Sequence, residues 1–560
     1  MKTLSKTLFA AALLSTATGC EKFLDINQNP NAFTPESVTP DVVLAQALNT
    51  TATLYTGGNT SGNVGTSPQN FNSYSSWAAG YWTKTNTVNG YSEEQTFNYT
   101  TSFYANLFNL TYDNLNDYNI IQLRGAGAYP NHVAVARIMK AYDFLLLVDQ
   151  YGDIPYSQAL LGAANVTPTY DKAQDIYKDL LVQLTAAIAE INNAPSSARS
   201  VGPEDIVFNG NMAKWKQFAN SLKLRILLRE SQTGNSAIDT DVRTQLQALQ
   251  NATDGFITTD VVVQPGYSQN QNQQNPLYNR YAYTQAGVAA TERNYQVPTQ
   301  YILDQYNSNN DPRLSQLYTE GSTLVGGTAT PGYVGGVLGE GTPPAASGTA
   351  TANTRVASRF LGQETASPGD ATPGGVFKGF NQATPLMLLS EQLFSKAEAE
   401  TRGLMVGGND AAKADFNNGI LASFMYFYRT AADLPAAIPA NTAASTLAGV
   451  PEYNTFIGTT ATGGSNVANP LVNFDVATTN GTLGKQTIII YQKYLAMNTV
   501  ASTEAWDDYR RTGLPKIPLS PQATKFATRL LYPLSETNTN SANVPKGVDQ
   551  FTKIFWDVVD

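Results

Sequence analysis

The sequence contains very few of the residues that most often carry chemistry: one cysteine, Cys20, and one histidine, His132. A single cysteine excludes an internal disulfide, and a zinc site of the usual kind needs several Cys or His ligands. A Ser-His-acid triad would depend on His132, whose place at the start of an apolar stretch is more typical of a packing or surface residue. We therefore expect no metal, no cofactor and no triad chemistry.

Charged residues are also scarce, at 14% of the 560 residues, and acidic residues outnumber basic ones by 44 to 35. An acidic chain without a basic cluster repels phosphate backbones, so nucleic acid is not an expected partner. Hydrophobic residues make up 42% of the chain, which is enough for a large core. The surface must then be mostly neutral and polar, and such a surface suits hydrogen bonding to neutral ligands.

No long apolar segment follows the first twenty residues, and residues 1–19 themselves have the pattern of a signal peptide. Two lysines precede a short apolar stretch, which is well below the ~20 apolar residues that a membrane span needs. We expect cleavage after Gly19, so that Cys20 becomes the first mature residue and carries acyl chains, each buried CH₂ contributing ~0.8 kcal/mol to membrane binding. The alternative is a chance cysteine near a cleavage site, and Ala17 stands where bacterial lipoprotein signals usually have Leu.

Apolar residues recur at helical spacing along much of the chain, and strand patterns are few. The predicted helices cover 131–150, 171–191, 212–230, 385–402, 414–428 and 503–512. The strand candidates are 206–208, 256–258 and 261–263. The sequence predicts a mainly α fold of helical pairs, in which any tetratricopeptide-like repeat is degenerate because no strict 34-residue spacing is present.

Two long segments, 321–375 and 431–469, are rich in Gly, Thr, Ala and Pro. Their composition alone fits linkers between domains, but predicted helices lie close on both sides. We therefore expect loop excursions from one domain over 41–560, preceded by a tether over 20–40.

Aromatic residues gather beside amides in two stretches, a composition that suits sugar binding. Exposed rings stack on the CH groups of a sugar, and nearby polar side chains fix its orientation. Alternatively, the same rings pin long loops to the core. The candidate ligand-binding residues are Trp77, Tyr81, Trp82 and Tyr91 in the first stretch and Tyr278, Asn279, Tyr281 and Tyr283 in the second.

Paired carboxylates are the remaining catalytic option, because two of them in one cleft can hydrolyse glycosides. Acidic residues are adjacent at Glu93-Glu94 and at Asp507-Asp508. Neighbouring residues on a helix point in different directions, so neither pair forms a cleft by itself. Carboxylates that are distant in the sequence could still meet, which leaves a surface glycoside hydrolase as an alternative.

Several segments, in order along the mature chain, resemble the SusD/RagB family of outer-membrane lipoproteins, and most closely its SusD-like branch. They are 20–27 (CEKFLDIN), 29–31 (NPN), 151–156 (YGDIPY), 212–215 (MAKW), 218–225 (FANSLKLR), 310–314 (NDPRL), the helix 385–403, 492–493 (QK), 504–513 (EAWDDYRRTG), 532–533 (YP) and Glu536.

This resemblance implies an all-α core of tetratricopeptide-like helical pairs that supports a more irregular, loop-rich half. It implies a lipid-anchored protein on the outer face of the outer membrane. Such a protein caps a SusC-like, TonB-dependent transporter and binds oligosaccharide or peptide without catalysis. The resemblance does not single out ligand residues, which vary within the family. A glycoside hydrolase and a surface adhesin are the competing hypotheses.

Overall fold

The computed structural model describes most of the chain after the tether. The described residues are 38–57, 69–88, 91–125, 127–348, 355–361, 374–458, 466–478 and 483–559. The predicted signal peptide, Cys20 and nearly all of the tether lie outside these residues, as do parts of both long loops.

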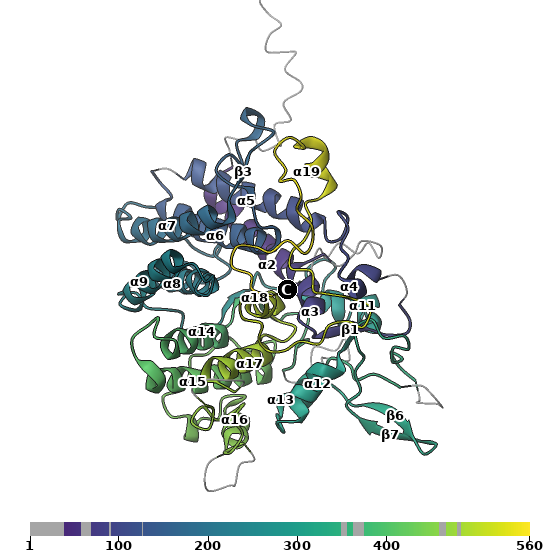
Figure 1. Ribbon diagram of the computed structural model, residues 1–560. Coiled ribbons are helices and arrows are strands. Elements are labelled where there is room, and N and C mark those ends of the chain that lie inside the picture. Colours follow the sequence, from purple (N-terminus) through teal and green to yellow (C-terminus); the bar gives the residue numbers. More distant parts are fainter. Residues whose placement is uncertain are drawn as a thin grey trace, which may run out of the picture.

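Long helices stack side by side along one half of the molecule (Figure 1). In the N-terminal part, α5 packs on α6, α6 on α7, α7 on α8 and α8 on α9, while α14 continues the stack by packing on α8, α15 and α17. The helices of this half are α2 (Pro40–Tyr55), α5 (Asn106–Arg124), α6 (Pro130–Tyr151), α7 (Ala173–Asn192), α8 (Met212–Arg229), α9 (Ser236–Gln250), α14 (Leu389–Thr401), α15 (Gly408–Tyr428), α16 (Val450–Ile457), α17 (Lys485–Met497) and α18 (Ser502–Thr512). The predicted mainly α fold is confirmed.

The apolar spacing explains how these helices are placed. In α7, Ile176, Leu180 and Leu184 lie on one face and are buried, whereas Val182 on the opposite face is exposed. Helix α6 is buried on nearly every side because α5, α7 and α8 all pack against it. An outer helix of the stack therefore needs one apolar stripe, and the central helix needs apolar residues all round.

Glycines end two of the predicted helices. Gly152 follows α6 with φ 73°, and a Cβ at this position would lie 3.0 Å from Nη1 of Arg529. Gly513 follows α18 in the left-handed conformation, with φ 69°. Only glycine adopts such backbone angles without strain, so both residues stop a helix and turn the chain.

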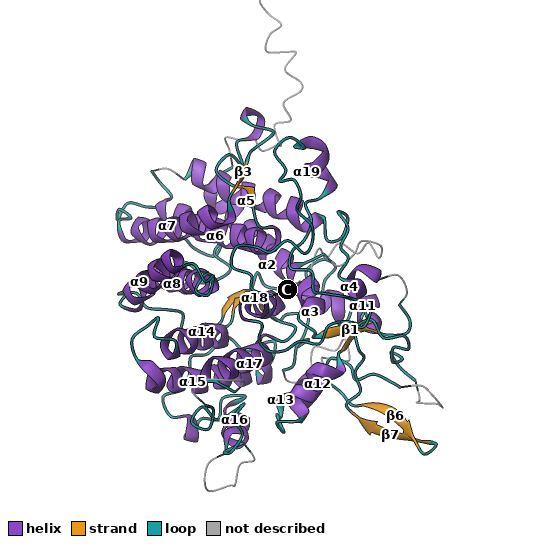
Figure 2. Ribbon diagram, in the orientation of Figure 1, coloured by secondary structure: helices purple, strands orange, loops and turns teal. Residues whose placement is uncertain are grey.

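Strands are short and occur in antiparallel pairs (Figure 2). Strand β4 was expected from its three valines, and it pairs with β8, which is distant in the sequence. The pairs are β1 (Trp82–Lys84) with β5 (Gln296–Pro298), β2 (Ile154–Pro155) with β3 (Tyr170–Asp171), β4 (Val261–Val263) with β8 (Thr384–Met387), and β6 (Gly321–Val325) with β7 (Thr328–Gly332). These pairs form no extended sheet among the described residues.

Two strand predictions and the starts of two helices were wrong, since α15 begins at Gly408, six residues before the predicted start at residue 414. Residues 256–258 form no strand, and the helix predicted over 385–402 begins only at Leu389, because the residues before it pair with β4 as strand β8. Residues 206–208 are drawn into a turn around Asp205, whose Oδ1 accepts the backbone N–H groups of Val207 and Phe208 at 3.0 Å. A short acidic side chain can thus override the strand preference of apolar neighbours.

The other half of the molecule is irregular, with short helices between long loops (Figure 1). The β6–β7 hairpin projects from this half, so the first part of the predicted 321–375 loop is a regular hairpin. The short helices of this half are α3 (Phe71–Ala78), α4 (Ser92–Thr96), α10 (Pro276–Tyr281), α11 (Thr291–Tyr295), α12 (Gln300–Asn307) and α13 (Arg313–Leu317). One further short helix, α19 (Leu534–Thr539), lies instead beside β3 and α5 (Figure 1). Across the described ranges, no helix has the length and apolar character of a membrane span.

Candidate ligand-binding region

The two aromatic stretches predicted from the sequence meet in space. Trp82 of β1 lies edge-on to Tyr281 of α10, with ring centroids 5.0 Å apart, and Trp77 of α3 lies 5.7 Å from Trp82. Phe360 and Phe377 complete the group, at 5.9 Å from Trp82 and 6.4 Å from Tyr281, respectively. We call these five rings the aromatic cluster. Rings at such distances and angles attract each other beyond the area that they bury.

Hydrogen bonds to the C-terminal part of the chain hold β1 in place. Trp82 Nε1 donates to Thr499 Oγ1 at 2.9 Å. The hydroxyl of Tyr81 donates to the carbonyl of Tyr494 at 2.6 Å, and the two rings stack 4.5 Å apart. Because β1 also pairs with β5, its side chains cannot shift without moving three separate segments.

The predicted aromatic residues are buried rather than exposed. Trp82 and Tyr81 are fully buried, and even the most accessible of these rings, that of Tyr283, belongs to a residue only 9% exposed. Trp77, Tyr91, Tyr278 and Tyr281 lie between these extremes, and Asn279 is half-buried. In this structure the rings therefore fix loops to the core, and ligand contact by these residues stays a prediction.

Two cations lie over rings at the edge of this region. Lys84 Nζ is 4.5 Å from the ring centroid of Tyr91 and 4.9 Å from that of Trp77, and it forms an ion pair with Glu94 at 3.2 Å. Burial raises the pKa of Glu94, although Lys84 acts in the opposite direction. The lysine thus joins a carboxylate and two ring faces at the border between the core and solvent.

The guanidinium of Arg293 lies 4.8 Å from the ring centroid of Tyr283 at another edge. Burial raises the pKa of both Tyr278 and Tyr281 to about 12, so these phenols stay neutral and can donate hydrogen bonds at ordinary pH. The hydroxyl of Tyr281 also accepts a hydrogen bond from Asn70 Nδ2 at 3.4 Å.

The aromatic cluster leaves no room for a ligand among its own rings. The gap that Trp82, Tyr281 and Phe360 share with Arg293 and Gln296 is smaller than a water molecule. A ligand in this region would therefore have to lie on the rim. Asn86 and Thr87 are exposed there, just after β1.

Several residues around the cluster were not predicted from the sequence. Arg293, Gln296, Arg359, Phe360 and Phe377 line the gap, yet they come from three separate segments. None of these segments has the local concentration of aromatics and amides that marked the two predicted stretches. Only the fold brings them together.

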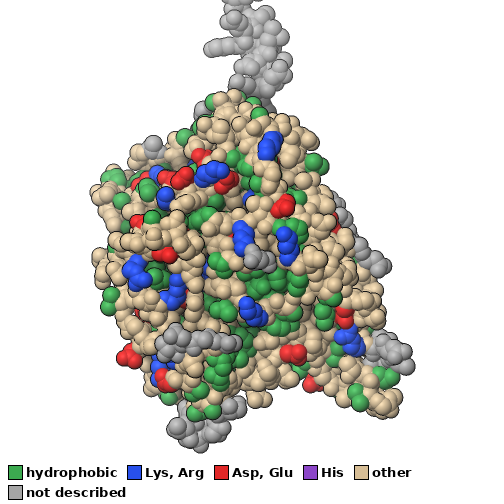
Figure 3. All heavy atoms as spheres, in the orientation of Figure 1, with side chains coloured by type: hydrophobic (Ala, Val, Ile, Leu, Met, Phe, Trp, Pro, Cys, Tyr) green, Lys and Arg blue, Asp and Glu red, His purple; other side chains and the backbone are tan. Residues whose placement is uncertain are grey.

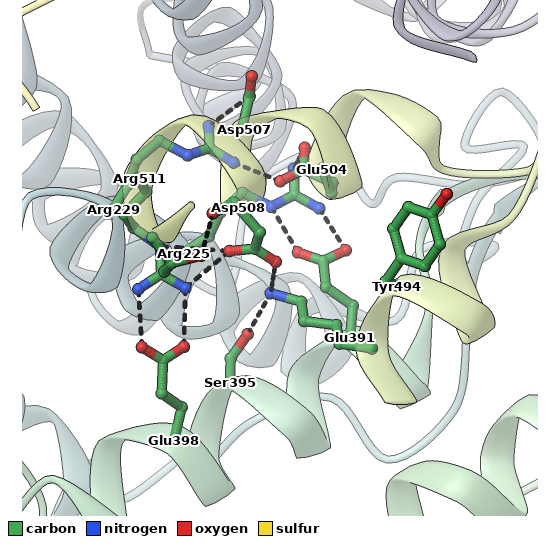
Figure 4. A network of polar contacts seen from close by, with 12 residues as sticks. Arg225, Arg229, Glu391, Ser395, Glu398, Tyr494, Glu504, Asp507, Asp508 and Arg511 are labelled. Atoms are coloured by element: carbon green, nitrogen blue, oxygen red, sulfur yellow. Dashed lines mark hydrogen bonds and ion pairs between the residues drawn. The ribbon is translucent and has the colours of Figure 1, made fainter. Parts of the chain in front are cut away.

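A buried network of ion pairs joins α8, α14 and α18 (Figure 4). Arg225 of α8 holds Glu391 of α14 through two hydrogen bonds of 2.8 Å, and its Nη1 lies 3.2 Å from Glu504 of α18. Arg511 of α18 holds Glu398 of α14 through two bonds of 2.7 Å. Bidentate arginine–carboxylate geometry of this kind fixes both distance and orientation.

In the second acidic pair, Asp507 and Asp508 face basic side chains rather than a cleft. Burial by itself would raise the pKa of Asp508, but Lys493 at 2.8 Å and Arg511 at 2.7 Å hold it at about 2. Asp507 forms ion pairs with Arg229 and Arg510. Its low pKa suits Asp508 to a structural role, because a general acid needs a pKa near the working pH.

The remaining candidate groups are also engaged. His132 is buried, and its Nε2 lies 2.8 Å from Glu204 Oε1. Glu94 faces Lys84, whereas Glu93 accepts a hydrogen bond from Thr100 Oγ1 at 3.3 Å. Within the part of the chain that the structure describes, no cluster of three or more His, Cys, Asp or Glu side chains could hold a metal ion.

The surface has the neutral character that the composition predicted. Figure 3 shows a face on which Lys and Arg side chains are scattered among Asp and Glu, without a continuous patch of either sign. Hydrophobic side chains gather near the middle of the same face, so neutral polar and apolar groups rather than charge would guide most contacts there.

Comparison with known proteins identifies the family. Residues 32–533 match the family model of SusD-like proteins, described as starch-binding and associating with the outer membrane. No curated protein sequence matches the chain.

Solved structures with the same fold cover nearly the whole chain. A chitin-binding protein is 23% identical, with 94% of this chain and 100% of that chain covered and a TM-score of 0.65. A SusD homologue from Bacteroides fragilis is 21% identical, with 93% and 99% covered and a TM-score of 0.62. A SusD-like protein from Bacteroides thetaiotaomicron is 22% identical, with 92% and 98% covered and a TM-score of 0.64. From the family match and this shared fold, we conclude that the chain belongs to the SusD-like family.

Proposed function

We propose that the protein is a cell-surface lipoprotein that captures oligosaccharide, or peptide, and delivers it to a SusC-like, TonB-dependent outer-membrane transporter. The observation that carries this proposal is the family match over residues 32–533, because that family is described as starch-binding and associating with the outer membrane. The shared fold with SusD homologues supports it.

An oligosaccharide fits the surface better than a charged peptide does. The chain has only 14% charged residues, and one of the solved proteins with its fold is named a chitin-binding protein. Neutral sugars are recognised by hydroxyls and amides as well as ring faces, and Asn86, Thr87 and Asn279 present such polar groups to solvent in the irregular half.

The ligand is proposed to lie on the rim of the aromatic cluster. Asn279 is half-buried, and Tyr283 and Tyr91 lie at the edges where cations cover the rings. These three residues are the proposed contacts. The more deeply buried candidates, Trp77, Tyr81, Trp82, Tyr278 and Tyr281, are proposed to hold this rim in shape.

Cys20 is proposed as the membrane anchor. It is the single cysteine of the chain and follows a segment with the features of a signal peptide. Acylation there places the domain on the outer membrane, facing the exterior, where a tether over 20–40 gives it reach.

Binding without catalysis is favoured over hydrolysis. The two carboxylate pairs that could have served a glycoside hydrolase include Glu94, Asp507 and Asp508, each of which opposes a lysine or an arginine. An adhesin would share the anchor and the surface, but it would need no transporter.

Purification of the full chain from native membranes tests the proposal. A C-terminally tagged chain, extracted in mild detergent, is expected to bring down a TonB-dependent barrel in a fixed ratio. Deletion of its gene is expected to abolish growth on the captured nutrient but not on the corresponding monomer. Recovery of the chain without any barrel, together with unchanged growth, would contradict the delivery role.

A further inference from the structure

A cavity of about 230 Å³ lies in the helical half of the molecule, over α6 and between α5 and α7. Figure 1 shows these three helices side by side, on the opposite side of the view from the β6–β7 hairpin. We call this space the α5–α7 cavity. Its lining residues are Gln122, Arg137, Lys140, Ala141, Phe144, Tyr156, Asp179 and Gln183.

The ammonium group of Lys140 has only neutral partners. Its Nζ donates to Asn119 Oδ1 at 3.0 Å and to Gln122 Oε1 at 3.1 Å, both on α5. No carboxylate oxygen among the described residues lies within 4.0 Å of it. An ammonium group has three donors, so one hydrogen-bond position is open. Burial, assisted by nearby Arg137, lowers the pKa of Lys140 to about 8, which reflects a cation that lacks a compensating anion.

The opposite wall, on the α7 side, contains one ion pair and one carboxylate with neutral hydrogen-bond donors. Arg137 Nη2 lies 2.7 Å from Glu190 Oε1, and Arg137 Nε lies 3.1 Å from Oε2. Asp179 Oδ2 accepts hydrogen bonds from the Tyr156 hydroxyl at 2.5 Å and from Gln183 Nε2 at 3.0 Å. The other carboxylate oxygen of Asp179 can accept hydrogen bonds from hydroxyls but would repel an anion. The amide oxygen of Gln183 accepts a hydrogen bond from Arg137 Nη1 and has a second acceptor position for a hydroxyl.

A ligand that complements both walls would therefore have an anionic group near Lys140 and hydroxyls near Asp179. An aromatic pair, Phe144 and Tyr156 with ring centroids 4.6 Å apart, contributes an apolar surface to the same cavity. The volume lies below the roughly 300–1,000 Å³ of ordinary ligand pockets, which limits the occupant to about one sugar ring.

We propose that the α5–α7 cavity binds a single acidic sugar ring, a uronic acid, with its carboxylate on Lys140 and its hydroxyls toward Asp179 and Gln183. This site is separate from the rim of the aromatic cluster, and the inference does not rest on the proposed function.

Titration calorimetry of the purified full chain with glucuronate tests this inference, with glucose and acetate as separate titrants. Glucuronate is expected to bind in saturable fashion and at least about tenfold more tightly than glucose or acetate, because only it presents both kinds of group. Lys140→Gln is expected to weaken glucuronate binding about tenfold or more.

Lys223→Gln is the matched control. Lys223 lies on α8, is partly buried with a lowered pKa as well, and lines a different cavity. Its substitution is expected to leave glucuronate binding unchanged. Equal losses in both variants, equal affinity for glucose, or the absence of saturable binding would each overturn the proposal.

Chemical labelling of the unmodified chain decides the question even if Lys140→Gln does not fold. Glucuronate is expected to slow acetylation of Lys140 by acetic anhydride, measured by peptide mass spectrometry, and to leave Lys223 unaffected. Unchanged labelling of Lys140 at saturating glucuronate would overturn the proposal.

Discussion

At the scale of single residues, the fold depends on charges that are buried in pairs. Arg511 is almost fully buried, and it is shared between Glu398 and Asp508 (Figure 4). Removing one partner of such a group is costly, because it leaves the other charges buried without compensation. A comparable pair on the surface contributes little, because water and salt screen it.

Arg511→Met should therefore destabilise the protein by about 3–5 kcal/mol in urea unfolding. Lys413→Met is the control, since its partner Asp475 and Lys413 itself are both exposed, and its effect should stay below about 1 kcal/mol. Similar losses in the free energy of unfolding of the two variants would show that the buried network does not contribute this stability.

Asp143 presents the opposite case, a buried carboxylate that forms no ion pair with any Lys, Arg or His of the described residues. It accepts hydrogen bonds from Thr51 Oγ1 at 3.0 Å and from Asn114 Nδ2 at 2.8 Å. Burial raises its pKa to about 7, and the two hydrogen bonds only partly oppose this shift. Because the folded state holds the proton more tightly than the unfolded state, the stability contributed by this group falls as pH rises from about 4 to about 7.

Asp143→Asn should consequently stabilise the protein at pH 8 by about 3 kcal/mol, with the gain vanishing near pH 4. The amide keeps the shape and can accept from Asn114 while donating to Thr51. Thermal unfolding across this pH range measures the effect. A gain that is the same at pH 4 and pH 8 would rule out titration of Asp143 as its source.

At the scale of elements, close approach between α14 and α15 requires a glycine in the middle of a helix. A Cβ on Gly419 would lie 2.8 Å from Cε1 of Phe394. Alanine favours a helix over glycine by about 1 kcal/mol, but a ring in a packed core cannot move aside at low cost.

Gly419→Ala should therefore lower the free energy of unfolding by about 1–3 kcal/mol despite the better helix propensity. In a Phe394→Leu background the same change should cost less, because the smaller side chain leaves room. Chemical denaturation of the four proteins gives the coupling between the two sites. The absence of coupling would mean that the contact does not limit the packing.

The sequence predicted elements with strong local patterns and failed where distant partners decide the structure. The predicted bounds of helix α7 differ from the structure by two residues at its start and one at its end. They are this close because the spacing of the apolar residues can be recognised from the local sequence alone. Strand β8 was assigned to a helix, because its partner β4 lies more than a hundred residues earlier. The predicted binding residues were drawn from composition, which does not distinguish a buried ring such as Trp82 from an exposed one.

At the scale of the whole molecule, the account requires a domain held at a membrane through one residue. Cys20→Ala should release the protein from the outer membrane without changing its fold, because the cysteine precedes every described element. Fractionation and surface labelling of whole cells measure this loss. Continued membrane association of the variant, at the level of the unmodified chain, would contradict the proposed lipid anchor.

The central claim, that the protein binds its nutrient without transforming it, is tested most directly by one binding measurement. The purified full chain is titrated with a panel of oligosaccharides and peptides, and each ligand is recovered afterwards for mass analysis. The account predicts saturable binding of at least one oligosaccharide, recovered intact, with affinity reduced by Asn279→Ala. Shortened ligand, or no binding across the panel, would contradict it.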